Sequence, residues 1–290
     1  MNHFLFNLIL VISKLPLNFI YKITDFLIFF VFNVFRYRTK LIKDNIKNSF
    51  PEKSDKEIKE IIKGFHTHFS TLIAEIIKLF TITEEEQFNK LTINNLDSFV
   101  NRPNKSKNVV ILLGHVINWE LLFILKNLFL DTNIMGVYMK IQNKFWDEKI
   151  LNLRSKYGVN LIKMENTLDL MRNTTNDGSS FFLLIGDQSP HISKAKFSLN
   201  FLGRETPIFV GYDFLSVEKK FDVFYLEVES TKRGKYTLSL HDIKPENGEE
   251  FKELEISKKY FQLLEATIRK NPSNYLWTHN RWKHKKGVDY

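Results

Sequence analysis

The sequence predicts an α/β fold: a single domain with a largely parallel central sheet flanked by helices, preceded by an apolar N-terminal helical segment for membrane association. Two observations support this fold class. Between residues 109 and 186, short apolar runs alternate with helical patterns, which is typical of βαβ units and a parallel sheet. The first 36 residues are crowded with Phe, Leu and Ile and contain almost no acid. We therefore divide the chain into an apolar segment, 1–36, and a domain, 37–290.

The N-terminal segment is apolar but interrupted, because Lys14, Lys22 and Asp25 lie within it. Its longest uninterrupted apolar block, Phe26 to Phe35, is about half of the roughly 20 residues that a spanning helix needs. No small-residue cleavage site follows this block, which disfavours a secretory signal. We expect an anchor that lies in or enters one leaflet of a membrane, and a buried helical hairpin is the alternative.

The remaining elements follow from hydrophobic periodicity. Apolar residues recur at helical spacing over 55–80, with Ser54 as the N-cap and Glu57 three residues later, so we expect a long amphipathic helix there. Apolar runs predict strands, and helical patterns separate them. The predicted strands are 109–113, 133–139, 159–164 and 180–186; the predicted helices are 119–130, 145–157, 168–176 and 251–268; and 221–230 pairs with 235–243 as an antiparallel hairpin.

Composition excludes several kinds of chemistry. The chain has no cysteine, which excludes disulfides, thiolate zinc sites and cysteine nucleophiles. It also lacks a G-x-S-x-G elbow, a G-x-G-x-x-G fingerprint, a phosphate-binding P-loop and an H-E-x-x-H zinc helix. His66 and His68 are two residues apart on a helix and do not share a face, so we expect no metal site there. The net charge of +9 favours an anionic partner: nucleic acid, an anionic membrane surface or an acidic protein.

The stretch GHVINWE places His115 directly after the strand predicted at 109–113 and Glu120 in the following helix. A histidine followed five residues later by an acid also occurs at residues 241–246 and 284–289, so the spacing alone selects nothing. Sites in open α/β sheets gather at the carboxyl ends of the strands, which favours His115. An imidazole can take a proton from a hydroxyl near neutral pH, and Glu120 could orient the ring. A helix-capping histidine with a solvent-facing glutamate is the alternative.

Three other segments carry polar side chains that could contact a ligand. GDQSP places Asp187 and Gln188 after the strand predicted at 180–186, although this sequence is also an ordinary turn. FLGRETP places Arg204 beside an apolar segment, where it could pair with phosphate or be exposed. WTHNRWKHKKG, residues 277–287, combines two Trp with six basic or His residues, which suits single-stranded nucleic acid, lipid headgroups or an acidic protein. A solvated basic tail is the alternative.

These pieces together resemble the lipid A biosynthesis (late, HtrB-like) acyltransferases, a branch of the lysophospholipid acyltransferase superfamily. The resemblance covers nearly the whole chain and rests on the apolar N-terminus, GHVINWE, GDQSP, FLGRETP and NYLWTHNRWKHK. It implies transfer of a fatty acyl group from acyl carrier protein to a hydroxyl of a lipid A precursor, in lipopolysaccharide biosynthesis. It further implies no cofactor beyond the acyl donor, no nucleic acid partner, and a location on the cytoplasmic face of the bacterial inner membrane.

The resemblance also implies roles for individual residues. His115 matches the general base of the family's H-x-x-x-x-[DE] block, and Glu120 matches its acidic partner. Arg154 is the candidate for the basic residue that follows the second strand–helix unit, and Asp187 matches the Asp of the DQ block. The expected substrate-binding residues are Asn118, Arg154, Asp187, Gln188, Arg204 and Arg281.

The residues after the DQ block depart from the family pattern, because they read SPHISKAKFSLN in place of a stretch richer in Gly and basic residues. This departure motivates a second hypothesis, O-acylation of a lyso-aminolipid or a lysophospholipid. A third hypothesis from a different class is a basic membrane- or nucleic-acid-binding module, motivated by the net charge of +9 and residues 277–287.

Overall fold

The central sheet of the computed structural model, which describes residues 1–191, 193 and 195–284, has seven strands in the order β1-β9-β8-β2-β5-β3-β4. All neighbouring pairs in this sheet run parallel except β8 and β9, which form an antiparallel hairpin. The predicted α/β class is therefore confirmed. The strands are β1 (Leu91–Asn94), β2 (Val109–Leu113), β3 (Asn133–Tyr138), β4 (Asn160–Lys163), β5 (Ser180–Ile185), β8 (Asp222–Lys232) and β9 (Lys235–Asp242).

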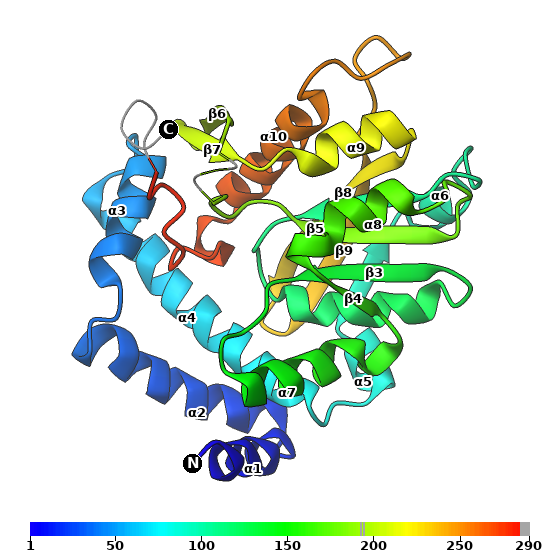
Figure 1. Cartoon of the computed structure of the whole chain (residues 1–290). Coiled ribbons are helices and arrows are strands. Elements are labelled where there is room, and N and C mark those ends of the chain that lie inside the picture. Colours follow the sequence, from blue (N-terminus) through cyan, green and yellow to red (C-terminus); the bar gives the residue numbers. More distant parts are fainter. Residues whose placement is uncertain (192, 194, 285–290) are drawn as a thin grey trace.

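Helices cover both faces of this sheet (Figure 1). Successive strand residues point to opposite faces, so neighbours on β8 identify what covers each face. The ring of Phe224 lies 4.9 Å from that of Phe99 on α6 (Leu96–Val100), and the ring of Tyr225 lies 6.0 Å from that of Tyr260 on α10 (Glu255–Lys270). Every residue of β2 is buried, which explains its uninterrupted apolar sequence. Helices α7 (Lys144–Arg154), α8 (Thr167–Asn173) and α9 (Gly211–Lys219) connect later strands, and α5 (Glu84–Phe88) precedes β1.

The long helix predicted over 55–80 is α4 (Asp55–Leu79), and its first turn has the predicted capping box. Ser54 Oγ accepts from the backbone N–H of Glu57, whose carboxylate accepts from the backbone N–H of Ser54 at 2.8 Å. Alongside α4 lies α2 (Leu17–Phe29), and α1 (Asn2–Ser13) precedes it as the first arm of a helical hairpin (Figure 1). A π-helical turn, Phe30–Val34, and α3 (Thr39–Ser49) lead from α2 into α4.

The N-terminal helices α1 and α2 are apolar on the side that faces away from α4. Among the described residues, Leu17–Val34 is the one helical stretch long and apolar enough to cross a membrane by length and composition. One face of this stretch packs on α4, where Ile20 is fully buried and Ile28 is 8 % exposed. The opposite face leaves Phe26 64 % and Phe29 57 % exposed. Helices α1 and α2 do form a hairpin. Its outer face is exposed, however, so the alternative of a buried hairpin is wrong.

Several elements differ from the prediction. The segment 119–130 is a 3₁₀ helix, Trp119–Leu128, and α10 begins at Glu255 because Leu254 adopts a left-handed φ of 58°. The prediction missed β1, α9 and a separate two-stranded antiparallel sheet, β6 (Phe197–Phe201) with β7 (Arg204–Ile208). Leu202 and Gly203 connect β6 and β7 with positive φ at both positions, a tight turn without the usual Asn-Gly signal. Residues 285–290, which include the acid of the third His-x-x-x-x-acid match, lie outside the described residues.

Candidate active site

The register of the central strands brings His115 and Asp187 to the same edge of the sheet. Leu113, the last residue of β2, pairs with Ile185, the last residue of β5, in a parallel ladder. Each functional residue follows two positions later, after Gly114 and Gly186 respectively. A Cβ at Gly114 would lie 2.4 Å from the Cδ1 of Leu264, so glycine lets α10 pack closely against this turn, and any larger residue would require Leu264 to shift. The strand ends therefore place a histidine and a carboxylate side by side.

His115 and Asp187 are joined by two hydrogen bonds. Nδ1 of His115 lies 2.6 Å from Oδ1 of Asp187, and the backbone N–H of His115 donates to Oδ2 at 3.2 Å. Because a carboxylate only accepts, the proton of the neutral ring resides on Nδ1, and the lone pair of Nε2 points away from Asp187. Nε2 is then available to accept a proton, which is the state that a general base requires.

The environment of Asp187 keeps its carboxylate charged even though it is 1 % exposed. Burial by itself would raise the pKa of Asp187, but the charge of His115 and hydrogen bonds from His115 and Tyr275 outweigh it. They hold the pKa below its ordinary value of 3.8. A buried negative charge beside an imidazole stabilises the imidazolium that forms when Nε2 takes a proton.

Gln188 and Trp119 contact the His115 ring, and His279 lies near it. The side-chain nitrogen of Gln188 lies 3.0 Å from Nε2, and the edge of the Trp119 ring packs against the imidazole with centroids 4.7 Å apart. The backbone N–H of Ser189 donates to Nε2 of His279 at 3.2 Å, which holds a second imidazole near this group. Burial lowers the pKa of His279 to about 4, so this second ring is neutral at pH 7. A polar substrate group that approaches Nε2 would displace the amide of Gln188.

Glu120 does not orient His115, and this part of the sequence-based hypothesis is wrong. The carboxylate of Glu120 accepts from Nε of Arg154 at 2.8 Å and from its Nη2 at 2.5 Å, a bidentate pair, and it also accepts from Nε1 of Trp119 at 3.2 Å. Burial opposes the charge of Arg154, but hydrogen bonds and the charge of Glu120 raise the pKa of Arg154 above its ordinary value. The partner that orients His115 is Asp187, which the sequence had suggested only as a substrate-binding residue.

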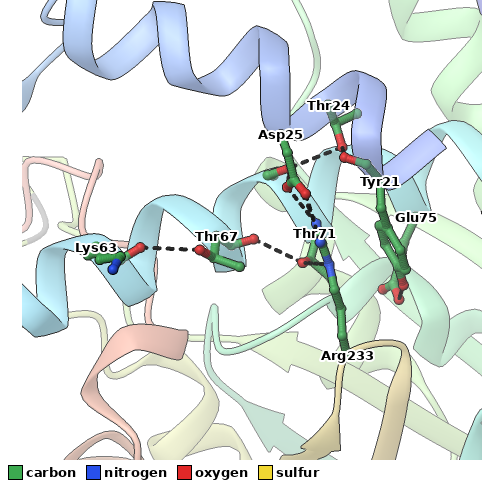
Figure 2. Close-up of polar contacts among 9 residues, drawn as sticks. Tyr21, Thr24, Asp25, Lys63, Thr67, Thr71, Glu75 and Arg233 are labelled. Carbon is green, nitrogen blue, oxygen red and sulfur yellow. Dashed lines mark hydrogen bonds and ion pairs between the residues drawn. The ribbon is translucent and has the colours of Figure 1, made fainter. Parts of the chain in front are cut away.

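Asn118 connects this site to α4 and α2. Its Oδ1 caps the 3₁₀ helix by accepting from the backbone N–H of Glu120 at 3.1 Å, and its Nδ2 donates to Oε2 of Glu75 at 3.1 Å. The same carboxylate accepts from the hydroxyls of Tyr236 at 2.7 Å and Tyr21 at 2.9 Å. Glu75 thus ties the loop after His115 to α2, where Figure 2 shows Tyr21 extending toward it.

The segment 274–279 closes the site from the C-terminal side. The backbone N–H of Ile117 donates to the carbonyl of Asn274 at 2.9 Å, and the N–H of Leu276 donates to the carbonyl of His115 at 3.1 Å. Ile117 itself has a φ of 59°, which is rare for a β-branched residue. Such strain persists only where the surroundings fix the backbone, and it is common at functional sites. The loop that carries His115 is therefore held on both sides.

Arg204 and Arg281 both lie against the β6–β7 sheet, and Arg281 also lies near Tyr275 and Asp187, whose charges oppose the lowering of its pKa by burial. Arg281 is 1 % exposed and donates to the carbonyl of Pro207 at 2.6 Å, while its Nε and Nη1 have no hydrogen-bond partner among the described residues. The guanidinium of Arg204 stacks on Trp282, 3.9 Å from the ring centroid. Trp277 is fully buried and Trp282 is 9 % exposed. Both tryptophans of residues 277–287 are therefore packed inside, although Asn280 and Lys283 are exposed, so the hypothesis that these aromatic rings stack on nucleic acid is wrong.

Sequence reasoning missed Glu75, Tyr275 and His279. A charged residue on the apolar face of α4, between Leu72 and Leu79, was a signal that Glu75 has buried partners. His279 lay inside the WTHNRWK segment but was counted only as part of its basic charge. Among the described residues, no group of three or more His, Asp or Glu side chains is arranged to hold a metal ion.

The fold and the site define a class of protein: an α/β enzyme with a histidine–carboxylate pair at the carboxyl edge of a parallel sheet, preceded by an apolar helical layer. A comparison with protein families then gives the identity. The model of the bacterial lipid A biosynthesis acyltransferase family matches residues 2–284, and the chain belongs to this family. No curated protein matches the chain. The protein is thus an acyltransferase of lipid A biosynthesis, and its lipid A-type acyltransferase resemblance is confirmed.

Proposed function

We propose that the protein transfers a fatty acyl chain from acyl carrier protein to a hydroxyl of a lipid A precursor, with His115 as the general base. The observation that carries this proposal is the hydrogen bond of 2.6 Å between Nδ1 of His115 and the buried carboxylate of Asp187. It gives the ring the tautomer and the charge stabilisation that a base needs. Membership of the acyltransferase family supplies the type of reaction.

In the proposed step, Nε2 of His115 removes the proton of the acceptor hydroxyl while the hydroxyl oxygen attacks the carbonyl carbon of the acyl thioester. A carbon–oxygen bond forms and the carbon–sulfur bond breaks. The departing thiolate of acyl carrier protein takes the proton back from the imidazolium. Asp187 stays ionised throughout and stabilises the imidazolium, so no acyl-enzyme is required.

In this proposal Glu120 pairs with Arg154 and not, as the spacing had suggested, with His115. Their ion pair lies one side chain from the imidazole, because Trp119 contacts both His115 and Glu120. We assign Arg154 to the acceptor side, where a guanidinium can pair with a phosphate of the lipid, and Glu120 to holding it in place. Asn118, Gln188, Arg204 and Arg281 remain proposed substrate-side residues.

The proposed location is the cytoplasmic face of the bacterial inner membrane. The exposed Phe26 and Phe29 on the outer face of α2 support contact with a bilayer. Arg38, at the start of the basic helix α3, donates to the carbonyl of Thr278 at 2.7 Å, so positive charge lies next to the segment that closes the site. Such a surface suits both a phosphorylated acceptor and an acidic carrier protein.

The test is transfer of a labelled acyl chain from acyl carrier protein to a lipid A precursor by the purified full chain. We expect His115→Ala to lower the rate about 10²- to 10⁴-fold, the usual contribution of a general base. His241→Ala is the matched control, because His241 also precedes an acid by five residues but lies on β9 and pairs with Glu227. Undiminished transfer by His115→Ala would reject the mechanism.

The acceptor needs its own test, because the SPHISKAKFSLN segment motivated a second acceptor class. Lipid mass spectra of cells with and without the gene separate the two hypotheses. Loss of one acyl chain from lipid A is the expected result. An unchanged lipid A together with missing acylated aminolipids or phospholipids would move the proposal to the second class, with the same His115 chemistry.

A further inference from the structure

A groove of about 480 Å³ lies between α2 and α4, away from His115. Such a volume is typical of pockets that hold a small ligand, and none of the residues that contact the His115 ring lines it. The residues that line it come from α2, the π-helical turn and the first half of α4: Asp25, Ile28, Phe29, Asn33, Lys59, Ile62, Lys63, His66, Thr67 and Ser70.

Helix α4 separates this groove from the active site. A Cβ at Gly64 would lie 2.3 Å from Oγ of Ser273, so this side of α4 packs against the residue that directly precedes the segment 274–279. Lys59 and His66 lie about half a turn around the helix from Gly64, at 100° per residue. The groove therefore opens on the side of α4 that faces α2, and its occupant is distinct from the substrate that reaches His115.

The groove is amphipathic, with positive charge at one wall and apolar side chains at the other. Lys59 and Lys63 are exposed, lie one helical turn apart and form no ion pair among the described residues. The ring of His66 stacks on Phe32 at 4.2 Å, and its Nε2 is buried without a hydrogen-bond partner in the described part of the chain. Ile28 and Ile62 supply apolar surface.

The one acidic residue of the lining does not neutralise these lysines. Asp25 accepts from Nη1 of Arg233 at 2.9 Å and from Nη2 at 2.7 Å, and Oγ of Ser70 also donates to it. Nε of Arg233 donates to Thr71 at 2.8 Å, so this arginine is fixed between α2 and α4 (Figure 2). The Asp25 charge is thus balanced by Arg233, and the charge of the two lysines is left over.

Phe29 belongs both to the groove and to the exposed apolar face of α2, at 57 % exposure. A molecule in the groove would therefore continue into the surface that contacts the bilayer. We propose that the groove binds one anionic phospholipid of the membrane, with its phosphate at Lys59 and Lys63 and an acyl chain against Ile28, Phe29 and Ile62. A negative headgroup matches the free lysines, and its tail remains in the apolar layer.

The proposal is tested on the full chain in detergent with a soluble probe, dihexanoyl phosphatidylglycerol below its micelle concentration. Its binding is followed by the NMR resonance of the His66 ring, assigned with His66→Gln. We expect saturable binding that the zwitterionic phosphatidylcholine analogue does not match. The double variant Lys59→Gln/Lys63→Gln should weaken binding by about 5-fold per lysine, the usual effect of one basic residue at an anionic lipid surface.

The matched control is Lys252→Gln/Lys258→Gln, which removes the same charge from exposed lysines at the start of α10, remote from α2 (Figure 1). Equal weakening by both double variants, or none by either, would overturn the groove site. Displacement of the probe by a phosphorylated glycolipid acceptor would reassign the groove to substrate and overturn the phospholipid assignment. Because every readout is binding, the result does not depend on whether acyl transfer is observed.

Discussion

Asp187 and Glu75 are two carboxylates of equal burial, each 1 % exposed, in regions with different chemistry. Asp187 lies at the sheet edge, and its partner His115 has a second nitrogen that faces the site. Glu75 lies on α4 and faces α2 and β9, where two tyrosine hydroxyls and the amide of Asn118 donate to it and the ammonium of Lys90 lies 3.9 Å away. Burial and the charge of Glu75 raise the pKa of Tyr21 and of Tyr236 far from neutrality.

This difference separates the carboxylate beside the proposed base from a structural one. A buried carboxylate takes part in proton transfer when its partner titrates near neutral pH and has a free position for substrate. The two tyrosines that donate to Glu75 keep their protons at physiological pH, because burial and the charge of Glu75 raise their pKa, so these hydrogen bonds hold elements together. Asn118 belongs to both regions, since it contacts Glu75 and caps the helix that carries Glu120.

The largest expected effect is on catalysis by Asp187→Asn. An asparagine can donate to Nδ1, which favours the tautomer whose proton is on Nε2 and removes the base. We expect the acyl-transfer rate to fall about 10²- to 10⁴-fold, as for loss of a general base. A rate within about 3-fold of the unsubstituted enzyme, far outside this range, would show that Asp187 does not orient His115.

The Asp187→Asn substitution should also change how the free energy of unfolding depends on pH. The pKa of Asp187 is below 3.8 in the folded protein, so its charge stabilises the fold above that pH and this contribution is lost as pH falls through the lowered pKa. Asp187→Asn should therefore flatten the acid limb of the free energy of unfolding below about pH 4. Denaturant unfolding as a function of pH measures it.

The next largest effect is on stability, by Glu120→Gln. It leaves the half-buried guanidinium of Arg154 without its bidentate partner, and removing one member of a buried pair costs about 3–5 kcal/mol. The double variant Glu120→Leu/Arg154→Met should regain most of this free energy of unfolding but not the acyl-transfer rate. Full activity in the stable double variant would exclude Arg154 from substrate binding.

A smaller effect is expected for Glu75→Gln, which tests the second of the two buried carboxylates. The amide nitrogen of Gln would face a hydroxyl or amide that previously donated, which costs about 1–3 kcal/mol of unfolding free energy, and Lys90 would lose the negative charge 3.9 Å from its ammonium. The rate per folded molecule should change far less than in Asp187→Asn. Tyr236→Phe is the control that removes a single hydrogen bond. A rate loss as large as that of Asp187→Asn would make Glu75 part of the catalytic group.

The smallest effect is expected at Asp25→Asn. This carboxylate pairs with Arg233 at 2.7 Å, but the two side chains are 44 % and 33 % exposed. Exposed ion pairs contribute about 0–1 kcal/mol, so thermal unfolding should shift little. A loss comparable to that of Glu75→Gln would show that the exposed end of the α2–α4 contact is as important as its buried end.

Residues close in sequence were predicted better than residues that the sheet brings together. The periodicity of α4, its capping box and the apolar runs of β2 and β5 are local, and the structure has them. The hairpin β6–β7 was missed because Leu-Gly is not a strong turn signal, and its strands are not continuously apolar. His115 was selected because it follows a buried strand, which is also a local property.

Apolar periodicity and short motifs along the chain were enough to predict the fold class and the family and to single out His115 as a candidate. Spacing along the chain could not predict which acid pairs with His115. Glu120 is five residues away, but Asp187, 72 positions along the chain, is the one in contact. The physical reason is the parallel register of β2 and β5, which aligns the strand ends, while the 3₁₀ helix carries Glu120 to Arg154. Side-chain spacing along one segment cannot encode a contact made between two strands.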